Sequence, residues 1–138
     1  MPELTIAGRR IADDEPCYVI AEIGNTHQGD LSIALKLIAA AAEAGACAVK
    51  LQKKDLPRLY AAQLASKPYE HEQSFGKTYG EHKAALEFEY SDLLECINAA
   101  DCAGIACFAT PFDESSADVL ERLEVPGYKI ASGGITDL

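Results

Sequence analysis

Charged and hydroxyl side chains stand near the ends of several apolar segments of this sequence. Two lysines interrupt apolar runs, Lys50 in AVKL (48–51) and Lys129 in YKIA (128–131). An ammonium group is costly to bury without a counter-charge, so each lysine alone is equally well explained by pairing with a carboxylate or by extending its amine to water. Two such lysines near the hydroxyls of Thr110 and Ser132 favour a cradle for a phosphate or carboxylate.

Glu22 ends the first apolar run and is the acidic counterpart of these cations. A carboxylate in this place either pairs with a lysine or, as a catalytic group, orients a substrate hydroxyl or handles a proton. Gln52 follows Lys50 by two residues, so in a strand both side chains share a face. We predict Glu22 as a catalytic residue and Gln52 as a residue that lines the site.

The loop after Glu22 reads GNTHQG (24–29) and contains Asn25 and His27. Its glycine spacing matches neither the dinucleotide-binding fingerprint nor the P-loop, so no motif supports nucleotide binding. A structural hydrogen bond in the turn explains His27 better than catalysis does. Asn25 and His27 are kept as candidate site-lining residues.

Apolar periodicity and turn residues predict the elements that position these side chains. We expect a β-hairpin over 4–11 that turns at Gly8. Four strands and three helices alternate after it. The strands are expected at 17–23, 46–52, 105–109 and 127–131, and the helices start after Asp30, at Ser91 and after Asp113. The polar segment 53–87 shows no sustained period apart from a short helix near 59–64.

Strands that alternate with helices predict an α/β fold with a parallel sheet. An open doubly wound sheet and the first half of a TIM-type (β/α)8 barrel both fit the order. Four β/α units at this spacing extrapolate to about 250 residues for eight, which is the usual size of a barrel. The 138 residues also stop directly after the fourth expected strand. We therefore predict that 1–138 is the N-terminal portion of one barrel, truncated after strand four.

The composition argues against several classes of partner. A formal net charge of −10 disfavours a nucleic-acid surface or an anionic membrane surface. No apolar run has the length of a membrane span and the start lacks a signal-like pattern, so we expect a cytoplasmic protein. The five cysteines form no C-x-x-C pair and no zinc-like spacing, which favours reduced, mostly buried thiols without chemistry.

Six stretches, in this order, resemble the sialic acid synthase (N-acetylneuraminate synthase) family. They are IAEIGNTHQG (20–29), AGACAVKLQ (44–52), SFGKTYGEH (74–82), LEF (86–88), ATPFD (109–113) and KIASG (129–133). No single stretch is decisive, but six in register across nearly the whole chain are specific. The resemblance implies a TIM-type barrel that condenses phosphoenolpyruvate with an N-acetylated aldose, such as N-acetylmannosamine, to give a nonulosonic acid and phosphate.

The resemblance also implies roles for individual residues. Lys50, Thr110, Lys129 and Ser132 would hold the phosphate and carboxylate of phosphoenolpyruvate, and Glu22 would lie beside the sugar aldehyde. The long polar loop, with Phe75, Tyr79 and His82, would help to cover the site. In the implied reaction C3 of the enol attacks the aldehyde, water adds at C2, and the tetrahedral intermediate loses phosphate by C–O cleavage.

Other parts that the resemblance implies lie outside these residues. They are a divalent metal (manganese or magnesium) held by two histidines of the second half of the barrel, and a C-terminal antifreeze-like domain that completes the site in a homodimer. We expect no metal ligands in this chain and no turnover by this chain alone. Gly134 departs from the family, whose sialic acid branch commonly has an acidic residue there, so the acceptor sugar stays open.

Two other functions compete with this one. A lysine aldolase would use Lys50 or Lys129 as the Schiff-base nucleophile on a barrel strand. A half-barrel without catalysis would serve as a binding or assembly module by pairing its open edges with a second copy.

Overall fold

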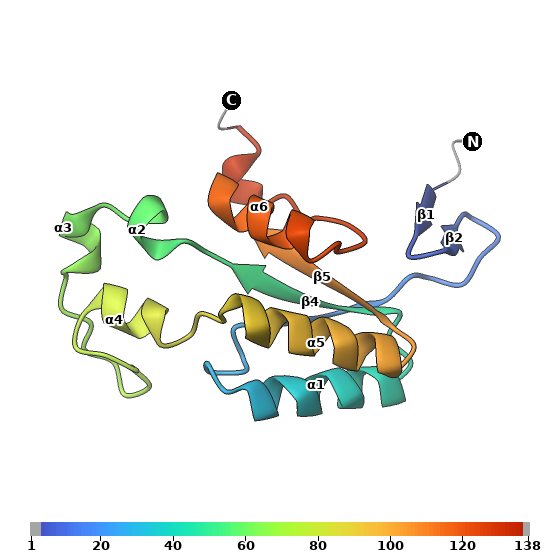
Figure 1. The fold of residues 1–138 in the computed structure, drawn as a ribbon, viewed down its shortest axis with the longest axis horizontal. Helices are drawn as coiled ribbons and strands as arrows, with labels where there is room; N and C mark the ends of the chain where they lie inside the picture. The colour runs from blue at the N-terminus through green and yellow to red at the C-terminus, as the bar shows by residue number, and fades with distance from the viewer. Residues whose placement is uncertain (1–3, 137–138) are drawn as a thin grey trace.

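The computed structural model describes residues 4–136 (Figure 1). Its first element is the predicted hairpin, in which β1 (Leu4–Ile6) pairs antiparallel with β2 (Arg9–Ile11). Ala7 and Gly8 both have positive φ, 49° and 76°. Two successive residues with positive φ match the right-handed twist of a two-residue hairpin turn, which explains the turn at Gly8.

A parallel sheet of three strands follows, in the order β3 (Ile20–Gly24), β4 (Ala48–Lys53) and β5 (Ala106–Pro111). The strands pair in register, with Glu22 opposite Lys50 and Gln52 opposite Thr110. This sheet confirms the predicted α/β class. The carboxyl ends of all three strands lie at one edge, because parallel strands run in the same direction.

The helices α1 (Leu31–Glu43), α5 (Tyr90–Cys102) and α6 (Glu114–Arg122) build one hydrophobic core with the sheet. Figure 1 shows α1 and α5 side by side along the sheet. The strand residues in this core alternate along each strand: Ile23, Val49, Leu51, Cys107 and Ala109. A doubly wound sheet places helices on both faces, whereas a barrel keeps them all outside. The shared core therefore favours the partial TIM-type barrel.

The opposite face of the sheet carries the polar candidates. Because neighbouring side chains point to opposite faces of a strand, Lys50 and Gln52 point away from the helices, on the face that carries Phe108 and Thr110. A small cluster of Ala48, Ala106 and Phe108, covered by Ile6 and Tyr18, fills this face at the amino ends of the strands. The carboxyl ends are left for polar side chains.

Two of the predicted helix starts are confirmed. The Asp30 carboxylate accepts hydrogen bonds from the backbone N–H of Ser32 (2.7 Å) and Ile33 (3.3 Å) at the start of α1. The Asp113 carboxylate accepts from the backbone N–H of Ser116 (2.7 Å) at the start of α6. Such caps satisfy donors that the first helical turn leaves free.

The predicted start of α5 is wrong by two residues. Glu89 is the N-cap instead of Ser91, and it forms a capping box in which its backbone N–H donates to Asp92 (3.0 Å). The inner face also differs from the prediction: Leu94, which we predicted to face inward, is exposed, whereas Cys96 is buried.

The polar segment after β4 contains three short helices, α2 (Leu56–Leu59), α3 (Ala62–Ala65) and α4 (Tyr79–Ala84). The predicted helix near 59–64 falls across α2 and α3, which a non-helical residue pair separates. Figure 1 shows all three beyond the carboxyl end of β4. The segment is therefore placed over the same end of the sheet as the candidate site residues.

The fourth predicted strand is wrong within the described residues. Residues 127–131 are extended but join β5 through a single parallel bridge, Tyr128 with Ala109, and the Lys129 backbone N–H donates to the Ala109 carbonyl (3.2 Å). This bridge is isolated, and a strand needs consecutive bridges to its neighbour. The chain then turns into the 3-10 helix η1 (Ser132–Gly134).

Candidate active site at the carboxyl ends of the strands

Glu22, Lys50 and Thr110 meet at the centre of the site. The Lys50 ammonium forms an ion pair with the Glu22 carboxylate and donates a hydrogen bond to the Thr110 hydroxyl (3.3 Å). The Lys50 side chain is 15% exposed and that of Glu22 is 51% exposed. The charge of Lys50 is thus largely desolvated, whereas its partner can exchange freely with water. One residue from each of the three strands contributes to this contact.

Gly24 leaves room for the side chains around it. It has φ of +54° at an irregularity in the pairing of β3 with β4. A Cβ at this position would lie 3.2 Å from Glu22 Oε1 and 3.3 Å from Gln52 Nε2. The absence of a side chain therefore lets the Glu22 carboxylate and the Gln52 amide approach the same point.

A cavity of about 790 Å³ collects five of the predicted residues at this end of the sheet. Its lining includes the four predicted phosphoenolpyruvate-binding residues together with Gln52: Lys50, Gln52, Thr110, Lys129 and Ser132. A smaller cavity of about 280 Å³ is lined by Glu22, Lys50, Phe108 and Lys129, among others. Lys50 and Lys129 line both cavities, so the two cavities adjoin and share two cations. Their volumes suit a small anionic ligand.

Lys129 and Ser132 are more open than Lys50. Lys129 is exposed, and its ammonium donates to the carbonyl of Ile130 (2.8 Å). Ser132 is exposed at the start of η1. A weak neutral partner leaves the Lys129 charge available to a ligand, in contrast to the ion-paired Lys50.

His27 lies in a different environment from the cavity residues. Its ring is 2% exposed, stacks on Phe88 with centroids 3.9 Å apart, and accepts a hydrogen bond from the Gly29 backbone N–H through Nδ1 (3.1 Å). Burial lowers the pKa of His27, although hydrogen bonding to the Gly24 backbone partly opposes the shift. These contacts make the ring a part of the turn between β3 and α1.

Asn25 and Tyr79 also lie away from the cavity of about 790 Å³. Asn25 lines a separate hollow of about 650 Å³ with residues of the polar segment, Phe75 and His82 among them. Tyr79 packs edge-on against Tyr60 and Tyr69, with ring centroids 5.3 and 5.8 Å away. Tyr79 therefore belongs to an aromatic cluster that stabilises the segment over the strand ends.

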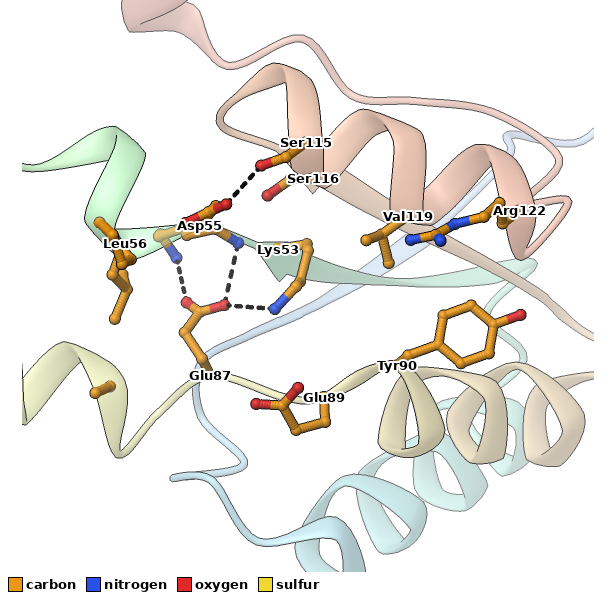
Figure 2. Close-up of a pocket in the computed structure, with 13 residues that line it drawn as sticks. Lys53, Asp55, Leu56, Glu87, Glu89, Tyr90, Ser115, Ser116, Val119 and Arg122 are labelled. Atoms are coloured by element: carbon orange, nitrogen blue, oxygen red, sulfur yellow. Dashed lines mark hydrogen bonds and ion pairs between the residues drawn. The ribbon is translucent and has the colours of Figure 1, made fainter.

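The sequence prediction missed a second charged network just behind the site. Lys54, which follows β4, is 6% exposed, and its ammonium donates to Gln52 Oε1 (2.7 Å) and lies 3.5 Å from Glu87 Oε1. Glu87 contacts both Lys53 and Lys54, and Figure 2 shows it next to Lys53, beside a cavity of about 490 Å³ that extends between α5 and α6. The only signal in the sequence is the pair Lys53–Lys54 at a strand end, because Glu87 lies more than thirty residues further on.

Neither a metal cluster nor a membrane span is found in the described part of the chain. Within residues 4–136 no group of three His, Cys, Asp or Glu side chains is arranged to hold a metal ion. No helix among the same residues is long and apolar enough to cross a membrane.

The parallel sheet with helices on one face and polar side chains at its carboxyl ends defines a class, the TIM-type α/β barrels, whose sites lie at that edge. Within this class, the chain belongs to the NeuB family, whose profile matches residues 37–138.

Relatives with assigned names support the family. The chain is 41% identical over 126 residues to N-acetylneuraminate-9-phosphate synthase of Homo sapiens, an alignment that covers 91% of this chain and 35% of the relative. It is 37% identical over 123 residues to N,N'-diacetyllegionaminic acid synthase of Legionella pneumophila, covering 88% of this chain and 35% of that protein. The chain thus spans about a third of the length of these relatives.

A solved structure shows the same fold. The crystal structure of N-acetylneuraminic acid (sialic acid) synthetase from Leptospira borgpetersenii serovar Hardjo-bovis, in complex with citrate, superposes with a TM-score of 0.79 at 30% identity. The match covers 99% of this chain and 43% of that one. The predicted family resemblance and the partial barrel are therefore both confirmed.

Proposed function

We propose that this chain forms the phosphoenolpyruvate-binding part of a synthase that condenses phosphoenolpyruvate with an N-acetylated aldose. The observation that carries the proposal is the convergence of Lys50, Thr110, Lys129 and Ser132 on one cavity at the strand ends. Two ammonium groups and two hydroxyls match a ligand that carries a phosphate and a carboxylate. Membership of a family that includes nonulosonic acid synthases supports this choice of ligand.

The ion pair gives Lys50 and Glu22 complementary roles in this proposal. The phosphate or carboxylate of the ligand competes with Glu22 for the Lys50 ammonium. Glu22 is half exposed and can then turn toward the aldose, where it orients a hydroxyl or handles the proton of the aldehyde oxygen. The fixed cations stabilise charge that shifts on the phosphate and carboxylate as C2 becomes electron-poor.

The reaction balances with one water. C3 of phosphoenolpyruvate forms the new C–C bond to the aldehyde carbon, and the aldehyde oxygen takes up a proton. Water adds to C2, and the C2–O bond of the tetrahedral intermediate breaks to release phosphate and leave a 2-keto acid. A divalent metal and a homodimer belong to the proposal as well, on the basis of the family resemblance, and so does the cytoplasmic location expected from the sequence.

Oxygen labelling tests the proposed reaction in the protein that carries this chain. Phosphate release from phosphoenolpyruvate should require N-acetylmannosamine or another N-acetylated aldose. In water enriched in ¹⁸O, the label should enter the keto group of the product and not the released phosphate, because C–O cleavage leaves the bridging oxygen on phosphorus. Label in the phosphate, or release without any aldose, would contradict the proposed reaction.

The lysine aldolase is the second candidate and makes an opposite prediction. A Schiff-base nucleophile has to be an uncharged amine at the moment of attack, whereas Lys50 is held in an ion pair with Glu22. Borohydride treatment in the presence of pyruvate should therefore leave Lys50 unmodified by mass spectrometry. The synthase reaction predicts no adduct on Lys129 either, because it forms no covalent bond to a lysine. A reduced adduct on either lysine would favour the aldolase.

A further inference from the structure

Lys54 is a buried cation directly behind the wall of the candidate site. Its ammonium has three neighbours: Gln52 Oε1 at 2.7 Å, Glu87 Oε1 at 3.5 Å and the ring of Phe112, whose centroid is 4.6 Å away. Gln52 and Phe112 both line the cavity of about 790 Å³, but Lys54 does not. The ammonium thus contacts two residues of the cavity wall without lining that cavity itself.

This contact fixes which end of the Gln52 amide faces the site. An ammonium group can only donate hydrogen bonds, so Gln52 has to present its carbonyl oxygen to Lys54. Its Nε2 donors are then directed to the other side, where Nε2 lies 3.3 Å from the place of a Gly24 Cβ. The Glu22 carboxylate approaches the same place. The N–H donors of the amide therefore lie on the side of Gly24 and Glu22, away from Lys54.

Glu87 supplies the counter-charge of Lys54 and also holds its backbone in place. The Glu87 carboxylate, whose side chain is 11% exposed, accepts a hydrogen bond from the Lys54 backbone N–H (3.0 Å) and lies 3.8 Å from the Lys53 ammonium. Burial lowers the pKa of Lys54, and the charge and hydrogen bond of Glu87 oppose that shift. Figure 2 shows these contacts converging on Glu87.

We propose that Lys54 and Glu87 are positioning residues that lock the Gln52 amide with its N–H groups toward the cavity, where they donate to an oxyanion of the bound ligand. The proposal rests on the proposed function for the identity of that ligand, phosphoenolpyruvate. Neither residue touches the ligand. Each acts through Gln52, because the orientation of the Gln52 amide determines whether the anion faces an N–H donor or a carbonyl oxygen.

Two readouts on the chain test the proposal. In Lys54→Met, which keeps the side chain as far as Cε but removes the ammonium donor, we expect the ¹H–¹⁵N signals of the Gln52 side-chain amide to move toward the positions of a solvent-exposed glutamine. Phosphoenolpyruvate affinity by isothermal titration calorimetry should fall about tenfold, the loss of one well-placed hydrogen bond to a charged group. Lys54→Arg should restore most of both, and Lys36→Met, on the exposed side of α1, should change neither.

A second variant keeps the test decisive if Lys54→Met does not fold. Gln52→Glu retains a partner for Lys54 and so preserves the buried charge pair, but it removes the N–H donors and adds a negative charge to the site. We expect a folded chain with at least tenfold weaker phosphoenolpyruvate binding. Unchanged affinity in this variant, or an unchanged Gln52 amide signal in folded Lys54→Met, would overturn the positioning role. The amide signal is measured without ligand, so it tests the positioning role even if the parent chain does not bind phosphoenolpyruvate. Absence of binding by the parent chain would count against the proposed function instead.

Discussion

Glu22 and Lys50 are direct neighbours across the parallel strands β3 and β4, and their side chains form an ion pair on the face of the sheet that lacks helices. The pair reconciles the two explanations that the sequence leaves open for each residue. The carboxylate is the partner that makes an inward lysine tolerable, and the lysine remains available to a stronger anion. Because Glu22 is half exposed, it can release Lys50 at little cost.

Replacement of Lys50 by methionine should weaken phosphoenolpyruvate binding strongly. The variant removes the least exposed cation of the cavity and leaves Glu22 as an unbalanced negative charge beside the ligand. We expect the dissociation constant measured by calorimetry to rise at least about 30-fold, in the range of a lost charge-assisted hydrogen bond of about 2 kcal/mol. The exposed lysine on α1 supplies the control, Lys36→Met, whose binding should equal that of the parent chain. A Lys50→Met chain that binds as tightly as the parent would remove Lys50 from the site.

Replacement of Glu22 by glutamine should separate binding from chemistry. A neutral amide no longer competes for the Lys50 ammonium and no longer repels the anionic ligand, so phosphoenolpyruvate affinity should rise a few-fold. Turnover of the protein that carries this chain should fall on the order of a hundredfold, since the group proposed to handle a proton is gone. Calorimetry and a phosphate-release assay measure the two effects, with Glu43→Gln at the exposed end of α1 as the control. Weaker binding together with full turnover would show that Glu22 supports phosphoenolpyruvate binding and takes no part in the chemical step.

The chain order of strands and helices was predictable because periodicity and caps are local signals. Asp30 and Asp113 precede apolar helical patterns, and both cap as expected. The fourth strand was not predictable in the same way. Residues 127–131 have the apolar composition of a strand, but whether they form one depends on the partners that complete a ladder, and a single bridge to Ala109 is formed within the described residues.

The residues of the candidate site also fall into two groups, those that local sequence signals could identify and those that only the tertiary structure brings together. Lys50, Thr110, Lys129 and Ser132 could be grouped from the sequence, because the strands that carry or precede them end at one edge of a parallel sheet. Lys54 and Glu87 could not, since their contact crosses a long polar segment whose path no period reveals. Asn25 and His27 were nominated by their place in the loop after Glu22, and Tyr79 by the family resemblance; the structure places all three outside the lining of the cavity of about 790 Å³. Their predicted part in lining the site stays a prediction.

The stability of the chain should fall as the pH drops through the range in which histidines titrate. Burial lowers the pKa of His27 below its ordinary 6.5, and the pKa of His82 is lowered as well, also mainly by burial. Below pH 6.5 the unfolded chain therefore binds protons more readily than the folded chain, and unfolding becomes more favourable. The free energy of unfolding from urea titrations should be nearly level above pH 7 and should decrease as the pH is lowered from about 7 to 5.

The variant His27→Gln should weaken this pH dependence. The change removes the stacked ring and lowers stability at every pH, but the loss between pH 7 and 5 should be smaller than in the parent chain, with the contribution of His82 remaining. Lys36→Met, at an exposed residue of α1, is the control and should keep the pH dependence of the parent chain. An unchanged slope in His27→Gln would show that the ring does not resist protonation in the folded chain.

Gly29 should tolerate alanine much less well than Gly45 does. Both residues have positive φ, 76° and 84°, so both substitutions carry the backbone penalty of a side chain in the left-handed region, about 1–2 kcal/mol. They differ in what surrounds the added methyl group. At Gly45, which follows α1, a Cβ meets nothing within 4 Å, whereas at Gly29 it would overlap the carbonyl oxygen of Ala85. That oxygen is backbone and cannot rotate away, so the loop between β3 and α1 or the end of the α4 segment has to move.

The difference in stability between the two variants measures how tightly the β3–α1 turn packs against the segment beyond the carboxyl end of β4. We expect Gly29→Ala to cost about 1–3 kcal/mol more than Gly45→Ala in urea unfolding, the usual penalty for overpacking. The displaced turn carries His27 and Asn25, so the variant should also disturb the ring signals of His27 in the NMR spectrum, while Gly45→Ala should leave them in place. Equal costs for the two substitutions would mean that the turn and the covering segment are not packed as tightly as the structure shows, and that the segment is free to move without the turn.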